Sequence, residues 1–509
     1  MNCELCIDDN DFIKKHLKDD VNKLALSKFP EGIDKQFVIR QIQARQVLGK
    51  KLPSWAENDE LIFPKKLSLE QCSSELTAKY KASLSTEFVE ERLSTKRHET
   101  ISADSCGLVE EKRFSVDSCE LVEEKEFSVD SCELVEEKRF SVDSCELVEE
   151  KEFSVDSCGL VEEKRFSVDS CGLVEEKEFS VDSCELVDKE RVLVDLTGGM
   201  GVDTAFLSDN FDKTFYVEMQ EELCEIAKHN FKILNKNIEV VNDNAEHFLT
   251  ICDEVDCIYL DPARRDEYGR KMVSLHDCSP DVVELHDLLL EKAKRVLIKV
   301  SPMLDIEMVK KELKDISVIH VVAVRNECKE ILICLQTTDN SSQLTAHSSQ
   351  LVATDLREGW NFTFFEEEEL NAQWTLADGV GKYLYEPGVA CMKAGCFKLL
   401  SQRYALDKLH RNSHLYTSDE LVSDFPGRVF EVLEVFPFDK KTKKEITSLL
   451  NQQPKANSQQ PKASVATRNF PLSADELRKN LGLQDGSEFY IFGTTMKGEK
   501  KIVILMKKI

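Results

Sequence analysis

The segment VLVDLTGGMGVDTAFLS, residues 192–208, joins a short apolar run to an amphipathic stretch through a turn rich in glycine. Gly198, Gly199 and Gly201 let the backbone of this turn approach a ligand without side chains in the way. Asp195 stands at the carboxyl end of the preceding apolar run, and the first N–H groups of a following helix would face the same ligand. This combination suits a ligand that carries both a carboxylate and an ammonium group.

Two later apolar runs also end in polar residues. The run ending in YVE places Glu218 about 20 residues beyond the turn, where an acid can accept both hydroxyls of a ribose. The run ending in VVN is followed by Asp243 and Asn244, which could reach an adenine amine. The alternatives are a solvated acid at a strand end and ordinary turn formers. S-adenosylmethionine (SAM) carries the carboxylate, the ammonium, the ribose and the adenine that these residues could bind, so the sequence predicts a SAM site. No metal site is predicted.

The G-x-G-x-x-G spacing of dinucleotide sites is missing from the glycine-rich turn. A nicotinamide-dependent oxidoreductase is therefore disfavoured.

Basic residues follow the fourth apolar run, in YLDPARRDEYGRK. Arg264 could stack on a base through its guanidinium plane or bind a phosphate, and pairing with Asp266 is the alternative. Arg265 and Arg270 would extend a basic, substrate-binding rim. After the fifth run, IKVSPMLDI places Lys299 where it could position a substrate.

The elements that must hold these residues alternate along the chain. Short, β-branched apolar runs alternate with amphipathic stretches from residue 191 onward, which predicts a βαβ series that forms a parallel sheet. The runs SVIHVVAV and EILICLQT are separated by a link too short for a crossover, so we expect an antiparallel hairpin there. The fold class predicted for residues 191–337 is α/β, with a Rossmann-like doubly wound sheet.

Residues 191–337 resemble class I SAM-dependent methyltransferases, on the motifs DLTGGMGVD, YVE and LDPA. LDPA is similar to the D/N-P-P-x motif of the members that methylate exocyclic amines of bases. The resemblance implies that Asp261 and Pro262 line the reaction site and orient the target amine, and it gives Arg264 a catalytic position in place of the usual aromatic. The second proline of the motif is Ala263 here.

A wider resemblance covers nearly all of the chain except residues 104–187. The segments LEQCSSELTAKYKASL, DCSPDV, YLYEP, SHLYTS and RNFPLSADELRK are similar to those of bacterial methyltransferases with ferredoxin-like and THUMP-like C-terminal domains. It implies a ferredoxin-like α+β domain at 350–425, a THUMP-like domain at 426–509, and RNA, either tRNA or rRNA, as the partner. The basic and aromatic side chains of His410, Arg411 and Tyr416 would contact that RNA.

Two further regions precede the sheet. Residues 1–95 place apolar positions at helical spacing, which predicts a helical N-terminal domain. Residues 104–187 are an acidic tandem repeat of 13 residues, DSCELVEEKRFSV with variants, and hold much of the net charge of −28. A period of 13 keeps no continuous apolar stripe on a helix or a strand, so we expect a largely disordered or weakly helical spacer. A short solenoid and a thiol-rich metal buffer are the alternatives.

Composition limits the class of protein. The chain contains no run of eighteen apolar residues and no basic-then-apolar leader, so we expect a cytoplasmic protein with no membrane association and no obligate protein partner. The predicted function is methylation of RNA. A protein or small-molecule acceptor, and a non-catalytic RNA-binding or assembly factor, are the alternatives.

Overall fold

The computed structural model describes residues 7–85, four short strands between residues 115 and 158, and residues 190–264, 274–336, 349–451, 461–486 and 488–509. The chain divides into two compact units. One consists of Met1–Lys81 and Val192–Ile509, and the other of Ala82–Arg191.

The first unit begins with short helices. They are α1 (Ile7–His16), α2 (Val21–Ala25), α3 (Lys35–Leu48), α4 (Pro53–Ala56) and α5 (Lys66–Gln71), and residues 75–85 are helical again. Asp20 and Asp34 begin α2 and α3, because each carboxylate accepts two N–H groups of the first turn. Leu48 of α3 belongs to a buried cluster that also contains Tyr216 and Phe231, so the N-terminal helices share a core with the sheet that follows.

That sheet has nine strands, in the order β15-β14-β12-β13-β11-β8-β5-β6-β7. The strands β5, β6, β7, β8 and β11 are parallel, whereas β13 lies antiparallel between β11 and β12. The predicted hairpin and the doubly wound α/β fold are therefore confirmed. The strand bounds are β5 (Val192–Asp195), β6 (Lys213–Glu218), β7 (Ile238–Asn242), β8 (Val255–Leu260), β11 (Ala293–Val300), β12 (Ile316–Val324), β13 (Glu327–Gln336), β14 (Gln350–Asp355) and β15 (Trp360–Phe365).

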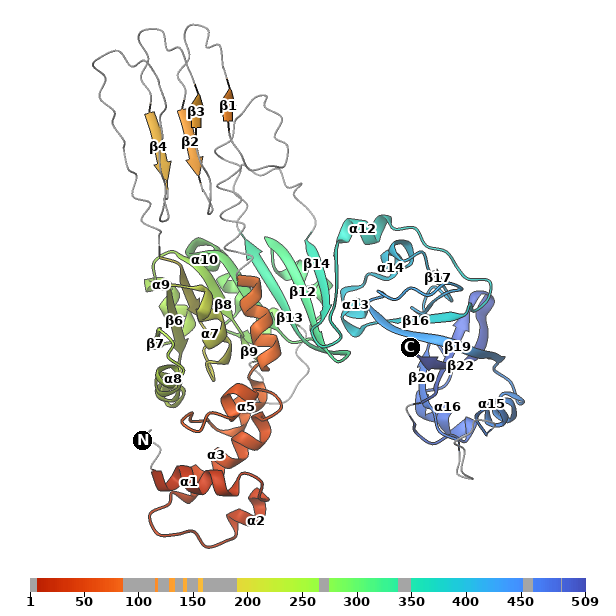
Figure 1. Cartoon of the computed structure of the whole chain (residues 1–509), viewed down its shortest axis with the longest axis horizontal. Helices are drawn as coiled ribbons and strands as arrows, with labels where there is room; N and C mark the ends of the chain where they lie inside the picture. Colours follow the sequence, from red (N-terminus) through yellow and green to blue (C-terminus); the bar gives the residue numbers. More distant parts are fainter. Residues whose placement is uncertain are drawn as a thin grey trace. The chain divides into compact units, whose positions relative to one another are not determined.

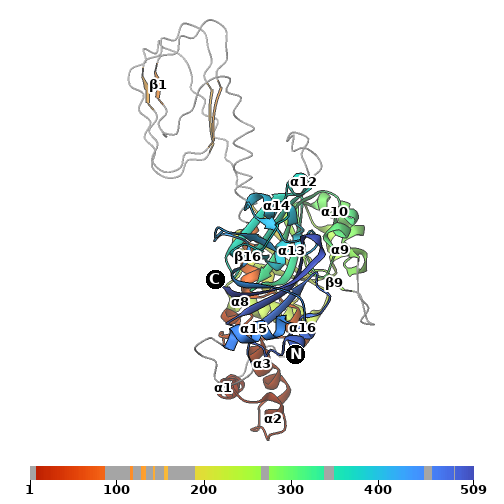
Figure 2. The same ribbon diagram turned by 90° about the vertical axis from the view of Figure 1, so that its right-hand side faces the viewer.

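Helices cover both faces of this sheet. Buried side chains of α9 (Ala245–Ile251), α10 (Val282–Lys292) and α11 (Ile306–Glu312) belong to one core cluster, and those of α7 (Val202–Leu207) and α8 (Glu221–Ile233) to another. The helices α9 and α10 lie side by side in both views (Figures 1 and 2).

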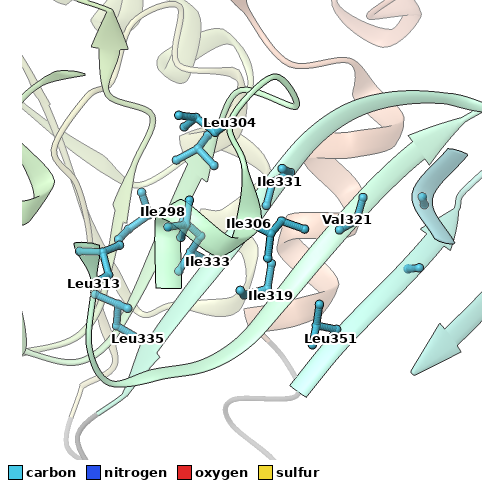
Figure 3. Close-up of a cluster of buried hydrophobic side chains, with 14 of the residues drawn as sticks. Ile298, Leu304, Ile306, Leu313, Ile319, Val321, Ile331, Ile333, Leu335 and Leu351 are labelled. Carbon is cyan, nitrogen blue, oxygen red and sulfur yellow. The ribbon is translucent and has the colours of Figure 1, made fainter. Parts of the chain in front are cut away.

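The first of these clusters is made by alternate residues of the strands (Figure 3). Ile319 and Val321 of β12 lie beside Ile331 and Ile333 of β13, and all four are fully buried. The neighbours of these residues along the strands, such as His320 and Glu330, therefore point to the opposite face of the sheet. One face of these strands is wholly apolar, while the other carries buried polar groups.

The sheet extends past the boundary predicted at residue 337. The strand β14 pairs parallel with β12, and β15 pairs antiparallel with β14, so residues 350–365 belong to the nine-stranded sheet rather than to the ferredoxin-like region. The physical reason is edge pairing, since β14 satisfies the open backbone groups of β12.

The C-terminal part forms a second sheet of seven strands, in the order β17-β18-β16-β19-β22-β21-β20. The strands β21 (Tyr490–Met496) and β22 (Lys500–Lys508) pair antiparallel near the end of the chain. The strands β16 (Tyr383–Pro387) and β19 (Gly427–Pro437) pair across the predicted boundary at 425/426, so the two predicted domains share one sheet. The other bounds are α12 (Glu366–Asn371), α13 (Val389–Ala394), α14 (Phe397–Arg403), β17 (Asp407–Lys408), β18 (Tyr416–Ser418), α15 (Thr442–Asn451), β20 (Ser464–Arg468) and α16 (Ala474–Leu481).

The described part of the second unit includes four short strands of the repeat, β1 (Ser115–Asp117), β2 (Ser128–Cys132), β3 (Ser141–Asp143) and β4 (Ser154–Cys158). β1 pairs parallel with β3, and β2 with β4, each with its equivalent two copies further along the sequence. The predicted disordered or weakly helical spacer and its alternatives stay predictions. The rest of 104–187 lies outside the described residues.

Within the described ranges, no helix is long and apolar enough to cross a membrane.

Asn230 of α8 links the N-terminal helices to the region that contains the nine-stranded sheet. Its side chain accepts from the Ile62 N–H at 2.9 Å and donates to the Ile62 carbonyl at 2.8 Å, and it is fully buried. We predict that Asn230→Ala lowers the free energy of unfolding by about 2–4 kcal/mol, because two buried backbone groups lose their partners. Urea denaturation measures this. Asn361→Ala, at an exposed position, is the control, and equal stabilities of the two variants would contradict the prediction.

Candidate active site

A cleft of about 250 Å³ lies at the carboxyl ends of β5, β6 and β8. Ligands of open α/β sheets bind at this edge. Residues of the glycine-rich turn, of the three strand ends and of the N-terminal helical segment line the cleft. They include Ser68, Gln71, Cys72, Ser73, Asp195, Gly198, Gly199, Gly201, Asp203, Glu218, Asp243, Asn244, Tyr259 and Asp261.

The glycine-rich turn has no room for side chains. A Cβ on Gly198 would lie 2.2 Å from the ring of Tyr216, and one on Gly201 would lie 2.7 Å from the ring of Phe231. Gly199 and Gly201 have φ values of +54° and +79°, in the left-handed region. Tyr216 also donates its hydroxyl to the Gly199 carbonyl at 2.6 Å. The bare backbone of the turn therefore lines the cleft.

Asp195 holds this turn. Its carboxylate accepts from the Thr204 hydroxyl at 2.5 Å and from the Thr197 N–H at 3.0 Å. Burial raises the pKa of Asp195 to about 7, against the effect of these hydrogen bonds. Both carboxylate oxygens of Asp195 already accept hydrogen bonds from the turn and from the helix that follows it. A contact between Asp195 and a ligand ammonium therefore stays a prediction.

Glu218, at the end of β6, ties the second strand to the turn. One carboxylate oxygen accepts from the Gly199 N–H and the other from the Gln220 N–H, both at 2.9 Å. Each carboxylate oxygen can accept a second hydrogen bond. Glu218 can therefore hold the turn and bind hydroxyl groups in the cleft together.

Asp243 and Asn244 follow β7 and line the same cleft. Asp243 contacts His247 at 2.6 Å, and this hydrogen bond holds the pKa of the carboxyl below its usual value. Asn244 accepts from the His247 N–H at 2.8 Å and so caps α9, which leaves its amide nitrogen for a ligand.

The structure brings Asp261 and Lys299 together. Because β8 and β11 are parallel with Leu260 opposite Ile298, the next residue of each strand lies on the same face, and the Lys299 ammonium contacts the Asp261 carboxylate. Lys299 is 12% exposed and Asp261 is 37% exposed. Burial lowers the pKa of Lys299, but Asp261, Asp203 and Glu330 outweigh it and raise that pKa above its usual value.

The structure describes only some of the other residues predicted for the acceptor side. Pro262 follows Asp261 and is half-buried. Arg264 lies in β9 (Ala263–Arg264), whose backbone pairs with β10 (Cys278–Ser279). Arg265, Arg270 and the alternative partner Asp266 lie outside the described residues.

Sequence reasoning missed a buried polar cluster beneath the cleft. Asp203, in the first turn of α7, accepts from the hydroxyls of Ser73 and Tyr259, both at 2.7 Å. Lys81 lies 3.3 Å from Asp203 and 2.7 Å from Glu330. The available signals were Asp203 itself, two residues after Gly201, and an acid within the apolar run EILICLQT.

The predicted RNA contacts of the C-terminal part need one correction. Tyr416 is fully buried and donates its hydroxyl to the Phe397 carbonyl at 2.6 Å, so its prediction as an RNA contact is wrong. The ring belongs to a core cluster that also contains Leu399 and Leu400 of α14. His410 is also buried and contacts Glu499 at 3.0 Å.

Among the residues that the structure describes, no group of three or more His, Cys, Asp or Glu side chains could hold a metal ion.

We predict that Gly198→Ala lowers the free energy of unfolding by about 1–3 kcal/mol, because the new Cβ must displace the buried Tyr216 ring. Gly379→Ala is the matched control, since a Cβ there meets nothing within 4 Å. Denaturant titration of both variants tests this. Equal midpoints for the two alanine variants would show that the turn is not closely packed.

Comparisons with known proteins agree with this architecture. A family model described as a ferredoxin-like domain matches residues 383–426, and one described as THUMP domain-like matches residues 427–508. The crystal structure of a provisionally assigned methyltransferase from Porphyromonas gingivalis W83 is 27% identical, with a TM-score of 0.69, and covers 99% of this chain and 98% of its own. A comparison with curated proteins found no match.

Two shorter proteins each match 30% of this chain. An rRNA methylase from Streptococcus thermophilus is 18% identical, covers 30% of this chain and 89% of its own, and has a TM-score of 0.24. A provisionally assigned methyltransferase from Streptococcus mutans, solved with SAH, is 16% identical, covers 30% and 90%, and has a TM-score of 0.23. No conclusion about this chain rests on these two similarities.

The predicted resemblance is thus confirmed: the chain has a class I methyltransferase fold followed by ferredoxin-like and THUMP-like regions.

Proposed function

We propose that this chain is a SAM-dependent methyltransferase that methylates RNA, on an exocyclic amine of a base in tRNA or rRNA. The observation that carries the proposal is the convergence of a side-chain-free turn, Glu218 and Asp243 on the cleft that also contains Asp261. These groups stand at successive strand ends of a class I methyltransferase sheet.

The residues of the cleft fit SAM. The turn at Gly198–Gly201 offers bare backbone, and a Cβ at Gly198 or Gly201 would meet a packed ring, so no side chain occupies this place. Glu218 keeps free acceptor sites for the ribose hydroxyls, and Asp243 and Asn244 offer an acceptor and a donor to the adenine. When bound, SAM supplies a methyl group on a positively charged sulfur.

Asp261 is the residue for the acceptor side. An amine conjugated to an aromatic ring is a poor nucleophile, and a carboxylate that accepts its hydrogen bond helps as the proton departs. Thr197 fixes the strand end, because its hydroxyl accepts from the Asp261 N–H at 2.6 Å. Lys299 contacts the carboxylate and so orients it, and the Asp261 side chain is still exposed enough to meet a substrate. Pro262 and Arg264 would line the place of the base, with Arg265 and Arg270 on the rim.

Two findings support RNA as the acceptor. The chain is similar over nearly its whole length to a provisionally assigned methyltransferase, and it ends in a THUMP-like region, a type of domain associated with RNA modification enzymes. A base within RNA must leave its stack to reach an acid at a strand end, and the basic residues after Asp261 suit the phosphates beside it. The cytoplasmic location stays a prediction.

The direct test is transfer of labelled methyl from SAM to RNA from a strain that lacks this gene, beside RNA from its parent. We predict label only in RNA from the deletion strain, and a loss of about 100-fold or more with Asp261→Ala because general acid–base help is removed. Asp253→Ala is the matched control, since this exposed acid lies before the opposite end of β8 and should retain full activity.

No label in any RNA, from protein that binds SAM, would contradict the proposal and favour a protein or small-molecule acceptor, or a non-catalytic role. Full activity of Asp261→Ala would contradict the assignment of this residue alone.

A further inference from the structure

The N-terminal helical segment forms part of the candidate site. Ser68 and residues 71–73 line the same cleft as the glycine-rich turn and Asp261. The segment is also fixed to the sheet unit by Arg40 and Lys65, which both contact Glu222 of α8. The wall of the cleft and its floor are therefore built from regions more than a hundred residues apart in sequence.

Lys81 extends from this segment into the floor. Its side chain is 0% exposed, and its ammonium lies 2.7 Å from Glu330, 3.3 Å from Asp203 and 3.1 Å from the Ser73 hydroxyl. A buried ammonium is costly unless charges and hydrogen bonds compensate it. Three partners in these positions make Lys81 a fixed cation rather than a solvated surface residue.

Asp203 is shared between two lysines. Lys81 faces its Oδ1, while Ser73 and Tyr259 donate to its Oδ2. Lys299 lies 3.8 Å from the same Oδ2, yet it makes its close contact with Asp261. Asp203 would attract Lys299 strongly if its own charge were not already compensated.

We propose that Lys81 is a positioning residue that acts through Asp203: by neutralising Asp203 it leaves Lys299 on Asp261, the residue assigned to the acceptor amine. The effect on methyl transfer rests on the proposed function, whereas the position of Lys299 does not. Ser73 assists, because its hydroxyl occupies the oxygen of Asp203 that Lys299 would otherwise approach.

The test uses the full chain with Lys81→Met and Glu330→Leu combined. This pair of changes removes one positive and one negative charge, so the net charge of the cluster stays the same. Apolar replacement of a buried ion pair is often neutral for stability. Tyr80→Phe is the matched control. It removes a partly buried hydrogen bond of 2.9 Å to His320 from the same helix.

Crystal structures and kinetics are the two measurements. In the double variant we expect Lys299 to leave Asp261 for Asp203. We also expect kcat with RNA to fall between about 10-fold and 100-fold through lost orientation, while the Kd for SAM changes little. Tyr80→Phe keeps the parental Lys299 contact and the parental kcat.

The inference is overturned if Lys299 stays on Asp261 in the folded double variant, or if the Lys299 contact shifts while kcat of an active enzyme is unchanged. Should the double variant fail to fold, Ser73→Ala tests the same arrangement, because it removes one of the two hydroxyl hydrogen bonds to Asp203 Oδ2, the oxygen that Lys299 would approach. If the parental chain transfers no methyl to RNA, the proposed function fails, and the Lys299 position still decides the inference.

Discussion

The carboxylate of Asp203 is buried, and this constraint determines how the region beneath the cleft is built. Burial disfavours the charge, but Lys81 and Lys299 hold the pKa of Asp203 below its usual value, and two hydroxyls donate hydrogen bonds to its Oδ2. These partners come from the N-terminal helical segment and from β8 and β11. The first helix after the glycine-rich turn is thereby fixed to three parts of the fold, and these partners together compensate the cost of burying an ionised carboxylate.

The alternation of side chains along strands explains why the chemistry gathers on one face. Val296 and Ile298 of β11 point into the apolar core, so Lys299 points the other way. The same alternation on β8 places Tyr259 and Asp261 on that face, with Ile258 and Leu260 in the core. A single apolar face stabilises the sheet, and the opposite face at its carboxyl edge is left for polar groups and a ligand.

Much of the candidate site could be predicted because its signals are local. The glycines, Glu218 and Asp243 each follow directly on an apolar run, and the parallel order of the runs brings their ends to one edge. The pairing of Lys81 with Glu330 could not be found in this way, since 249 residues separate them. Tyr416 shows the limit of residue type, because an aromatic residue in a polar segment can equally be a core residue. The extension of the sheet by β14 and β15 depends on edge pairing, which no local pattern reports.

The most direct test of the central claim is a crystal structure of the full chain with SAM or its demethylated product. We expect the ligand against the backbone of Gly198–Gly201, with its ribose hydroxyls on Glu218 and its sulfur on the side of Asp261. A ligand bound elsewhere on the chain, or in the cleft without contact to Glu218, would contradict it.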